Sequence, residues 1–172
     1  ACFAPGAPIP RDLLSATVEA ENSKQREDAL RRLGELGLLQ EEAGGALRLH
    51  RLLVRFVETV VEDGEAQQAA EEAVLRRAAA DNDTGYPGRL LAWQAHLRHV
   101  TGATVERRDE RAAALCNSLG YHLTAVGDTA AARSYLEQAL AINREVLGEG
   151  HPDTATSLNN LGYLLQDLGD PA

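Results

Sequence analysis

The chain has 172 residues, of which 44% are hydrophobic and 4% aromatic, and its formal net charge at pH 7 is −9. This length suits one or two compact domains with a core that needs no metal or disulfide. The acidic balance argues against nonspecific nucleic-acid binding, because phosphate backbones repel negative charge. No apolar run approaches the ~20 residues that cross a bilayer, so we expect no membrane segment.

The two cysteines, Cys2 and Cys116, lie far apart and lack the CxxC spacing of a metal or redox site. We expect reduced thiols in a cytoplasmic protein. The chain begins on ACFAPGAP and ends on LGDPA, and neither stretch is typical of a natural terminus. We therefore expect a piece of a longer protein.

Residues 1–62 predict the order helix, helix, β-hairpin, helix, which is that of a winged-helix domain. The first helix opens at Pro10, where a missing N–H costs nothing, and the second spans about 24–36 and ends at Gly37. Residues 38–42 and 46–50 flank two glycines and predict the strands. The last helix spans 51–62. The residues expected to face inward on the three helices are Leu13, Leu14, Val18, Ala29, Leu30, Leu33, Leu36, Leu53, Phe56, Val57 and Val60.

Residues 63–108 predict a second kind of unit, a helical hairpin that acts as an adaptor or is a degenerate repeat. A helix over 64–80 and a turn over 81–88 come first. A helix over 89–101 follows, and its spacing places four apolar residues on one face, namely Leu90, Trp93, Leu97 and Val100.

Residues 109–172 contain an internal repeat with a 42-residue period. When residues 112–130 are placed on 154–172, nine of the 19 positions are identical, whereas chance would give roughly one. Residues 110–125 and 129–147 predict two packed helices joined by a turn at Gly127-Asp128. Asp153 or Thr154 is expected to cap the next helix.

The segment LGYHLTAVGDTAAARSYLEQALAI resembles a tetratricopeptide repeat. Gly120 takes the small position of the first helix, Gly127-Asp128 takes the turn, and the second helix carries Ala132, Leu136 and Ala139. Cys116 replaces the usual aromatic residue, and the terminal proline is absent. The 42-residue period is similar to that of kinesin light chains and many bacterial signalling proteins. The resemblance implies a right-handed solenoid of helical hairpins, one repeat complete and one truncated, that binds protein or peptide on its concave face.

The N-terminal part resembles the winged-helix segment of signal-transducing NTPases of the NB-ARC (STAND) class. The stretches ACFAPGAPIPRDLL, LRRLGELGLLQ and LRLHRLLVRFV carry the resemblance. The family's Met-His-Asp motif reads Leu49-His50-Arg51 here, so His50 matches and Arg51 departs. The resemblance implies that His50 contacts the β-phosphate of bound ADP in a full-length protein, whose cofactor would be ADP or ATP. The alternative is that His50 is a histidine at the end of a strand that forms hydrogen bonds only with nearby residues.

The candidate groove residues are Asn117, Tyr121, Asn159 and Tyr163. Asn and Tyr are four residues apart in each helix and so share a face. The resemblance places this face in a groove where Asn bonds a peptide backbone. The alternative is that Tyr packs between repeats and Asn bonds a neighbouring helix.

No phosphate loop, HExxH motif or Ser/His/Asp grouping is visible, so we expect no catalysis, metal or bound cofactor in this chain. The leading hypothesis is a mainly α regulatory fragment of a bacterial STAND protein, in which the repeats bind a partner and the winged helix restrains the protein's own nucleotide-binding domain. The alternatives are a general tetratricopeptide scaffold and a DNA-binding transcriptional regulator that reads DNA through residues 24–36.

Overall fold

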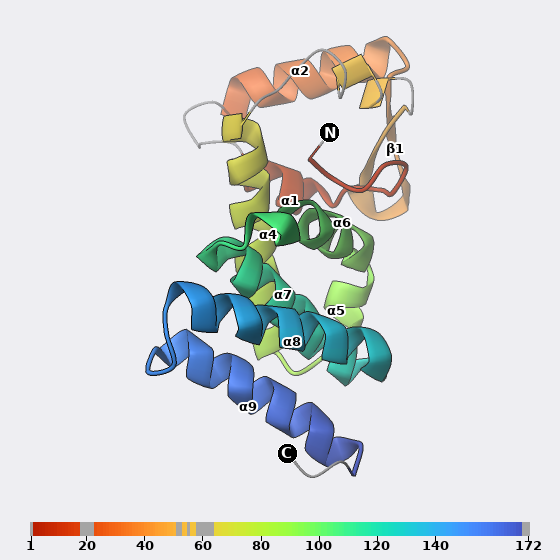
Figure 1. The fold of residues 1–172 in the computed structure, drawn as a ribbon. Helices are drawn as coiled ribbons and strands as arrows, with labels where there is room; N and C mark the ends of the chain where they lie inside the picture. Colours follow the sequence, from red (N-terminus) through yellow and green to blue (C-terminus); the bar gives the residue numbers. More distant parts are fainter. Residues whose placement is uncertain (1, 18–22, 51–52, 55, 58–63, 170–172) are drawn as a thin grey trace. The chain divides into compact units, whose positions relative to one another are not determined.

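The computed structural model describes residues 2–17, 23–50, 53–54, 56–57 and 64–169. The chain divides into two compact units, residues 1–77 with 93–100 and residues 78–92 with 101–172, and each is described by itself. The fold is mainly α, as predicted, with one small antiparallel β-hairpin (Figure 1).

The first unit contains the predicted hairpin. It follows α1 (Arg11–Ser15) and α2 (Ser23–Glu35), and it consists of β1 (Leu39–Glu41) and β2 (Leu47–Leu49). The strands pair antiparallel with Leu39 opposite Leu49, and a short 3-10 turn, Ala43–Gly45, joins them. Ile9 adds a bridge to Leu47, whose side chain is buried. The hairpin prediction is therefore confirmed.

Two predicted burial patterns in this unit are wrong. Ala29 on α2 and Leu36 directly after this helix are exposed, Leu36 by 56%. In the segment after the hairpin, Phe56 is 61% exposed and Val54 is buried in its place. Helical spacing identifies an apolar stripe, but burial also needs a neighbouring element that covers the stripe. Val18, Val60 and most of the predicted helix over 51–62 lie outside the described residues.

The core of the first unit also uses residues far along the chain. Helices α4 (Gly64–Asp83) and α6 (Gln94–Thr104) each contribute residues to both units. The guanidinium of Arg77 stacks 5.2 Å from the Trp93 ring centroid and also pairs with Asp12 of α1. The buried apolar residues of this unit include Phe3, Ile9, Leu13, Trp93 and Leu97.

The second unit contains the repeat. Its elements are α5 (Gly88–Leu91), a 3-10 turn (Val105–Arg107), α7 (Glu110–Ala125), α8 (Thr129–Val146) and α9 (Pro152–Asp167). Figure 1 shows α7, α8 and α9 packed side by side. The predicted bounds of α7 and α8 are confirmed to within one residue. The predicted helix over 89–101 is instead two helices, α5 and α6, although its four apolar residues are all buried as expected.

Candidate binding surface

Acidic side chains fix where α7 and α8 begin. The carboxylate of Asp109 accepts a hydrogen bond from the Ala112 N–H at 2.8 Å, and Asp128 accepts one from Ala131 at 3.4 Å. These bonds satisfy amides that a helix start leaves open, and a negative charge suits the positive end of the helix dipole. Partial burial opposes ionisation of Asp109, but the Ala112 bond and the Arg107 guanidinium outweigh it and lower the pKa of that carboxyl.

The start of α9 differs from the prediction. Neither Asp153 nor Thr154 caps it. His151 does, since its Nδ1 accepts a hydrogen bond from the Asp153 N–H at 3.2 Å. Pro152 occupies the first helical position, so the cap shifts to the residue before it. Thr154 instead donates its hydroxyl hydrogen to the carbonyl of Gly148 at 2.8 Å and thereby ties α9 to the end of α8.

Gly120 allows α7 and α8 to pack closely. A Cβ atom at this position would lie 2.7 Å from Cγ of Leu136 and 3.3 Å from the carbonyl oxygen of Ala132. Leu136 and Ala132 are fully buried, so Leu136 fills the notch that the glycine leaves. The small residue predicted at this position is therefore required by the helix contact.

A buried polar contact joins α8 to α9. The side-chain amide of Asn143 donates to Oγ of Ser157 at 3.0 Å and to the carbonyl of Asp153 at 3.2 Å. Asn143 and Ser157 are both buried. Because a buried amide without partners costs free energy, these bonds favour one register between α8 and α9.

The four predicted groove residues lie on α7 and α9 but are not equivalent. Tyr121 and Tyr163 are 42% and 63% exposed, and Asn159 is also exposed. Asn117 is half-buried, and its Oδ1 accepts a hydrogen bond from Nδ2 of Asn160 at 3.0 Å. The structure thus pairs Asn117 with Asn160 and leaves Tyr121, Asn159 and Tyr163 open to solvent. We call these three side chains the polar-aromatic row. The contact of Asn160 could not be read from the repeat alone, because its counterpart in the first repeat is Ser118.

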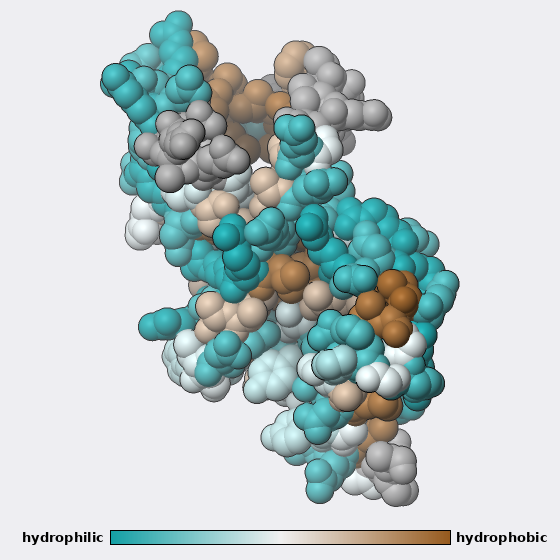
Figure 2. Space-filling model, turned by 90° about the vertical axis from the view of Figure 1, so that its left-hand side faces the viewer, coloured by the Kyte–Doolittle hydropathy of each residue, from teal (hydrophilic) through white to brown (hydrophobic). Residues whose placement is uncertain are grey.

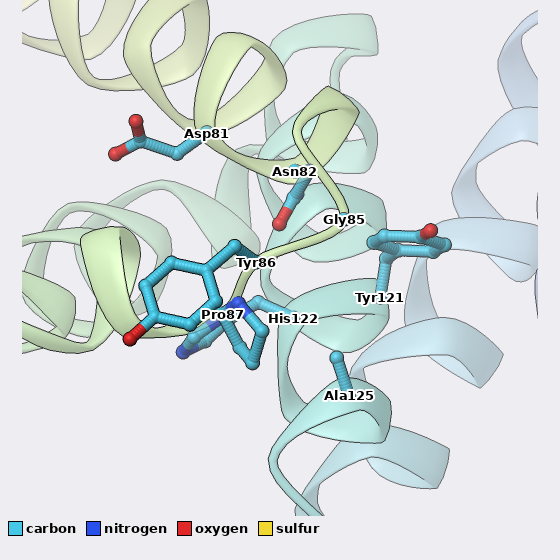
Figure 3. A pocket seen from close by; sticks show the side chains of 8 residues that line it. All are labelled: Asp81, Asn82, Gly85, Tyr86, Pro87, Tyr121, His122 and Ala125. Carbon is cyan, nitrogen blue, oxygen red and sulfur yellow. The ribbon is translucent and has the colours of Figure 1, made fainter.

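A small hollow lies beside Tyr121. Figure 3 shows the end of α4, with Asn82, and the turn after it, with Tyr86 and Pro87, on one side of the hollow. Helix α7 lies on the other side, with Tyr121 and His122. Asn82 joins the end of α4 to α7 by donating its side-chain amide hydrogen to the Ser118 carbonyl at 3.0 Å. The cavity volume is about 40 Å³, which is room for water but well below the ~300 Å³ of a typical small-molecule site. Any binding beside Tyr121 is therefore to a surface.

Exposed apolar side chains in the second unit are dispersed. On the face drawn in Figure 2, hydrophobic patches are separated by larger hydrophilic areas. The exposed large apolar or aromatic residues of this unit include Tyr86, Leu91, Tyr121, Val126, Val146, Leu158, Tyr163 and Leu168. Singly exposed apolar residues are ordinary on a protein surface and do not by themselves mark a binding site.

His50 lies at the end of the hairpin, where the sequence predicted it. Its N–H donates to the carbonyl of Leu38 at 2.9 Å, and its own carbonyl accepts from Leu53 at 2.9 Å and from Val54 at 3.3 Å. The side chain is exposed. Its backbone therefore connects the hairpin to the helical residues that follow. Arg51, the departure from the family motif, lies outside the described residues.

His96 has a structural position that sequence reasoning missed. Its ring is buried, its Nδ1 accepts from the Ala4 N–H at 3.1 Å, and its Nε2 donates to the Pro8 carbonyl at 2.9 Å. Phe3 packs edge-on against the ring at 5.5 Å between centroids. Burial lowers the pKa of His96, and the neighbouring charges of His99 and Arg77 act in the same direction. The neutral ring thus holds residues 3–8 against α6.

The arginines on α2 are paired within their own helix. Arg31 contacts Asp28 at 2.7 Å, and Arg32 contacts Glu35 at 3.3 Å. A helix that reads DNA needs cations directed at phosphates. These pairs offset that charge, and the DNA-binding alternative gains no support from α2.

Cys116 is fully buried, and this burial raises the pKa of its thiol to about 11. A thiol of that pKa is a poor nucleophile at neutral pH. Within the described ranges, no three His, Cys, Asp or Glu side chains are grouped as metal ligands. No helix in that part of the chain is both long and apolar enough to span a membrane.

Comparison with known families gives one result. Residues 110–172, which comprise α7, α8 and α9, match the family model described as tetratricopeptide repeat. No curated protein and no solved structure matches the chain. The repeat predicted for residues 109–172 is therefore confirmed as a tetratricopeptide repeat region, and the winged-helix assignment of residues 1–62 stays a prediction.

Proposed function

We propose that this protein is an interaction scaffold whose tetratricopeptide repeat region binds a protein or peptide partner through the polar-aromatic row. The observation that carries the proposal is the exposure of Tyr121, Asn159 and Tyr163 on the neighbouring helices α7 and α9. Rigid helices present these side chains, so binding needs little ordering of the surface. Tyrosine adds a large contact area and a hydroxyl that can bond a peptide backbone.

Selection from a phage-displayed library of random peptides tests this proposal. Peptides enriched on the purified chain are synthesised, and their affinities are measured by fluorescence anisotropy. We expect the double variant Tyr121→Ala/Tyr163→Ala to bind them at least about tenfold more weakly, a loss of about 1.4 kcal/mol. The tyrosines give a cleaner test than Asn117, because Asn117 also bonds Asn160 and its loss would change helix packing.

Val146→Ala is the matched control, since Val146 is an exposed apolar residue of α8 outside the row. It should bind the selected peptides as the wild type does. Failure to enrich any peptide, or equal weakening by Val146→Ala and the tyrosine variant, would contradict the proposal.

We also propose a more specific role, which rests on the resemblance of the N-terminal residues to STAND proteins. The order α1, α2, hairpin, with His50 at the end of the hairpin, agrees with the order that the STAND resemblance implies. In this role the repeats bind a partner, and the first unit restrains a nucleotide-binding domain of the full-length protein. Partner binding would then shift a two-state equilibrium.

The test of this role is retention of ADP by the full-length protein carrying His50→Ala. We expect ADP to dissociate at least about tenfold faster than from the wild type if the imidazole contacts the phosphate, a difference of about 1.4 kcal/mol. Unchanged retention would remove the nucleotide role and leave the scaffold function standing.

A further inference from the structure

The hollow beside Tyr121 has walls of different chemistry. It lies within the second unit, between the last turn of α4, the turn that follows this helix, and α7 (Figure 3). We call it the Tyr121 hollow and define it by Asn82, Tyr86, Pro87, Tyr121 and His122. Its walls combine hydrogen-bond acceptors with an aromatic ring, so they can recognise a particular chemical group.

The turn that forms one wall is held by its own hydrogen bonds. Oγ1 of Thr84 accepts a hydrogen bond from the Tyr86 N–H at 3.2 Å and donates one to the Asp81 carbonyl at 2.6 Å. The Gly85 N–H donates to the Asn82 carbonyl at 3.0 Å, and Gly85 has a φ of 66°, which favours glycine. The wall is therefore formed before a ligand binds, and binding needs little ordering.

Asn82 presents a hydrogen-bond acceptor to the hollow. Its Nδ2 donates to the Ser118 carbonyl of α7, and this bond identifies the other atom of the amide as Oδ1. Figure 3 shows the side-chain oxygen of Asn82 on the side of the hollow. Within the described part of the chain, Oδ1 accepts no hydrogen bond. A donor on a ligand can therefore bond to it.

The end of α4 beside the hollow is electrostatically negative. The carbonyl end of a helix carries a partial negative charge, which cations stabilise and carboxylates do not. The last turn of α4 nevertheless contains Asp81 and Asp83 and no basic residue. Asp81 lines the hollow, and none of the described lining residues is Lys or Arg. The charges around the hollow therefore favour a cation over an anion.

Tyr121 adds an aromatic wall. Its side chain is 42% exposed and borders the hollow. The face of an aromatic ring carries negative charge and attracts an ammonium or guanidinium group that lies over it. Tyr163, the equivalent residue of the second repeat, does not line this hollow. The two tyrosines of the polar-aromatic row thus differ, because only Tyr121 borders an acceptor-lined hollow.

The size of the hollow distinguishes between the two cationic side chains of proteins. Its volume of about 40 Å³ admits a few groups of the size of water. The ammonium group of lysine is compact, whereas the guanidinium group of arginine is a wider planar fork. The hollow therefore suits the end of a lysine side chain better than that of an arginine.

We propose that the Tyr121 hollow binds the ammonium group of a lysine side chain in the peptide that the polar-aromatic row binds. The ammonium donates to Oδ1 of Asn82 and lies against the Tyr121 ring, near Asp81. Tyr121 belongs to both the row and the hollow, so the lysine lies in the part of the peptide that covers α7. This inference rests on the proposed function and specifies the chemistry of its partner.

The probe is n-butylammonium chloride, titrated into the isotope-labelled chain and followed by NMR. This ion has the length and charge of a lysine side chain. We expect saturable shifts of the Asn82 side-chain amide and of the Gly85 N–H. 1-Butanol replaces the ammonium by a neutral hydroxyl and should bind at least about tenfold more weakly. Sodium chloride at equal concentration controls for ionic strength and should cause no saturable shift at these two residues.

The variant Tyr121→Leu should bind n-butylammonium at least about threefold more weakly, because leucine has no aromatic face. Tyr163→Leu is the matched control, since it makes the same change at the equivalent position outside the hollow. It should bind the ion as the wild type does. Absence of saturable shifts, equal binding of 1-butanol, or unchanged binding by Tyr121→Leu would overturn the inference.

Peptides selected on the chain provide the second measurement. Each lysine of a selected peptide is replaced in turn by norleucine, which keeps the length and removes the charge. One such replacement should weaken binding at least about tenfold. Peptides that bind through the tyrosines without any lysine would overturn the inference and leave the proposed function standing. Enrichment of no peptide at all would overturn both proposals.

Discussion

At the scale of single residues, His96 combines burial with two backbone hydrogen bonds. Its Nε2 carries the hydrogen that reaches Pro8, so its Nδ1 holds the lone pair that accepts from Ala4. Protonation would place a second N–H against the N–H of Ala4. The attachment of residues 3–8 to α6 therefore depends on the neutral ring.

This arrangement predicts a pH dependence of stability. Because the folded pKa of His96 is lowered, the unfolded chain binds the proton more readily, and stability falls as the pH drops through about 6.5 towards the folded pKa. The free energy of unfolding from urea titrations should therefore be smaller at pH 5 than at pH 7.5. His96→Gln should reduce this difference, and His99→Gln on the same helix should retain it. An identical pH dependence in wild type and His96→Gln would contradict the interpretation.

At the scale of elements, Gly120 and Gly162 form a matched pair of positions in different surroundings. They are equivalent under the repeat, yet α8 packs on one and open space surrounds the other. The same substitution at the two positions therefore differs in one respect, which is whether α8 packs against the substituted residue. The difference between the two effects measures the contact between α7 and α8.

Gly120→Ala should lower the free energy of unfolding by about 1–3 kcal/mol, because the added Cβ overlaps buried Leu136. Gly162→Ala should be neutral or raise it by up to about 1 kcal/mol, because alanine favours a helix more than glycine does. Chemical denaturation of both variants measures the difference. Equal effects of the two substitutions would contradict the packing described for α7 and α8.

The elements of the repeat could be predicted closely from sequence because local signals agree there. Gly127-Asp128 supplies both the end of α7 and the cap of α8, and nine identical positions fix the period. The cap of α9 was missed because histidine is a rare cap, and only the structure shows the bond from Asp153 to His151. Exposure of Leu36 and Phe56 could not be predicted either, since it depends on which elements lie nearby.

The candidate site was predicted in part. Tyr121, Asn159 and Tyr163 are exposed on α7 and α9, as a binding row requires. The bond between Asn117 and Asn160 joins helices of successive repeats, so it depends on the distance between these helices. The sequence pattern within one repeat does not predict that distance.

At the scale of the whole molecule, the two units differ in what supports their proposed roles. The family match covers residues of the second unit only. The second unit contains a tetratricopeptide repeat region that carries the polar-aromatic row. The first unit contains a hairpin, His50 and a histidine-anchored N-terminal segment. The scaffold function rests on the second unit alone, and the nucleotide-linked role requires both.

Hydrogen exchange of the chain with and without a peptide selected on it tests whether the tetratricopeptide repeat region is where the partner binds. The measurement reads every backbone amide and therefore reports where the partner binds. We expect slower exchange in α7 and α9 on binding, and unchanged exchange in residues 2–50. Protection confined to residues 2–50, with α7 and α9 unaffected, would contradict the proposed binding surface.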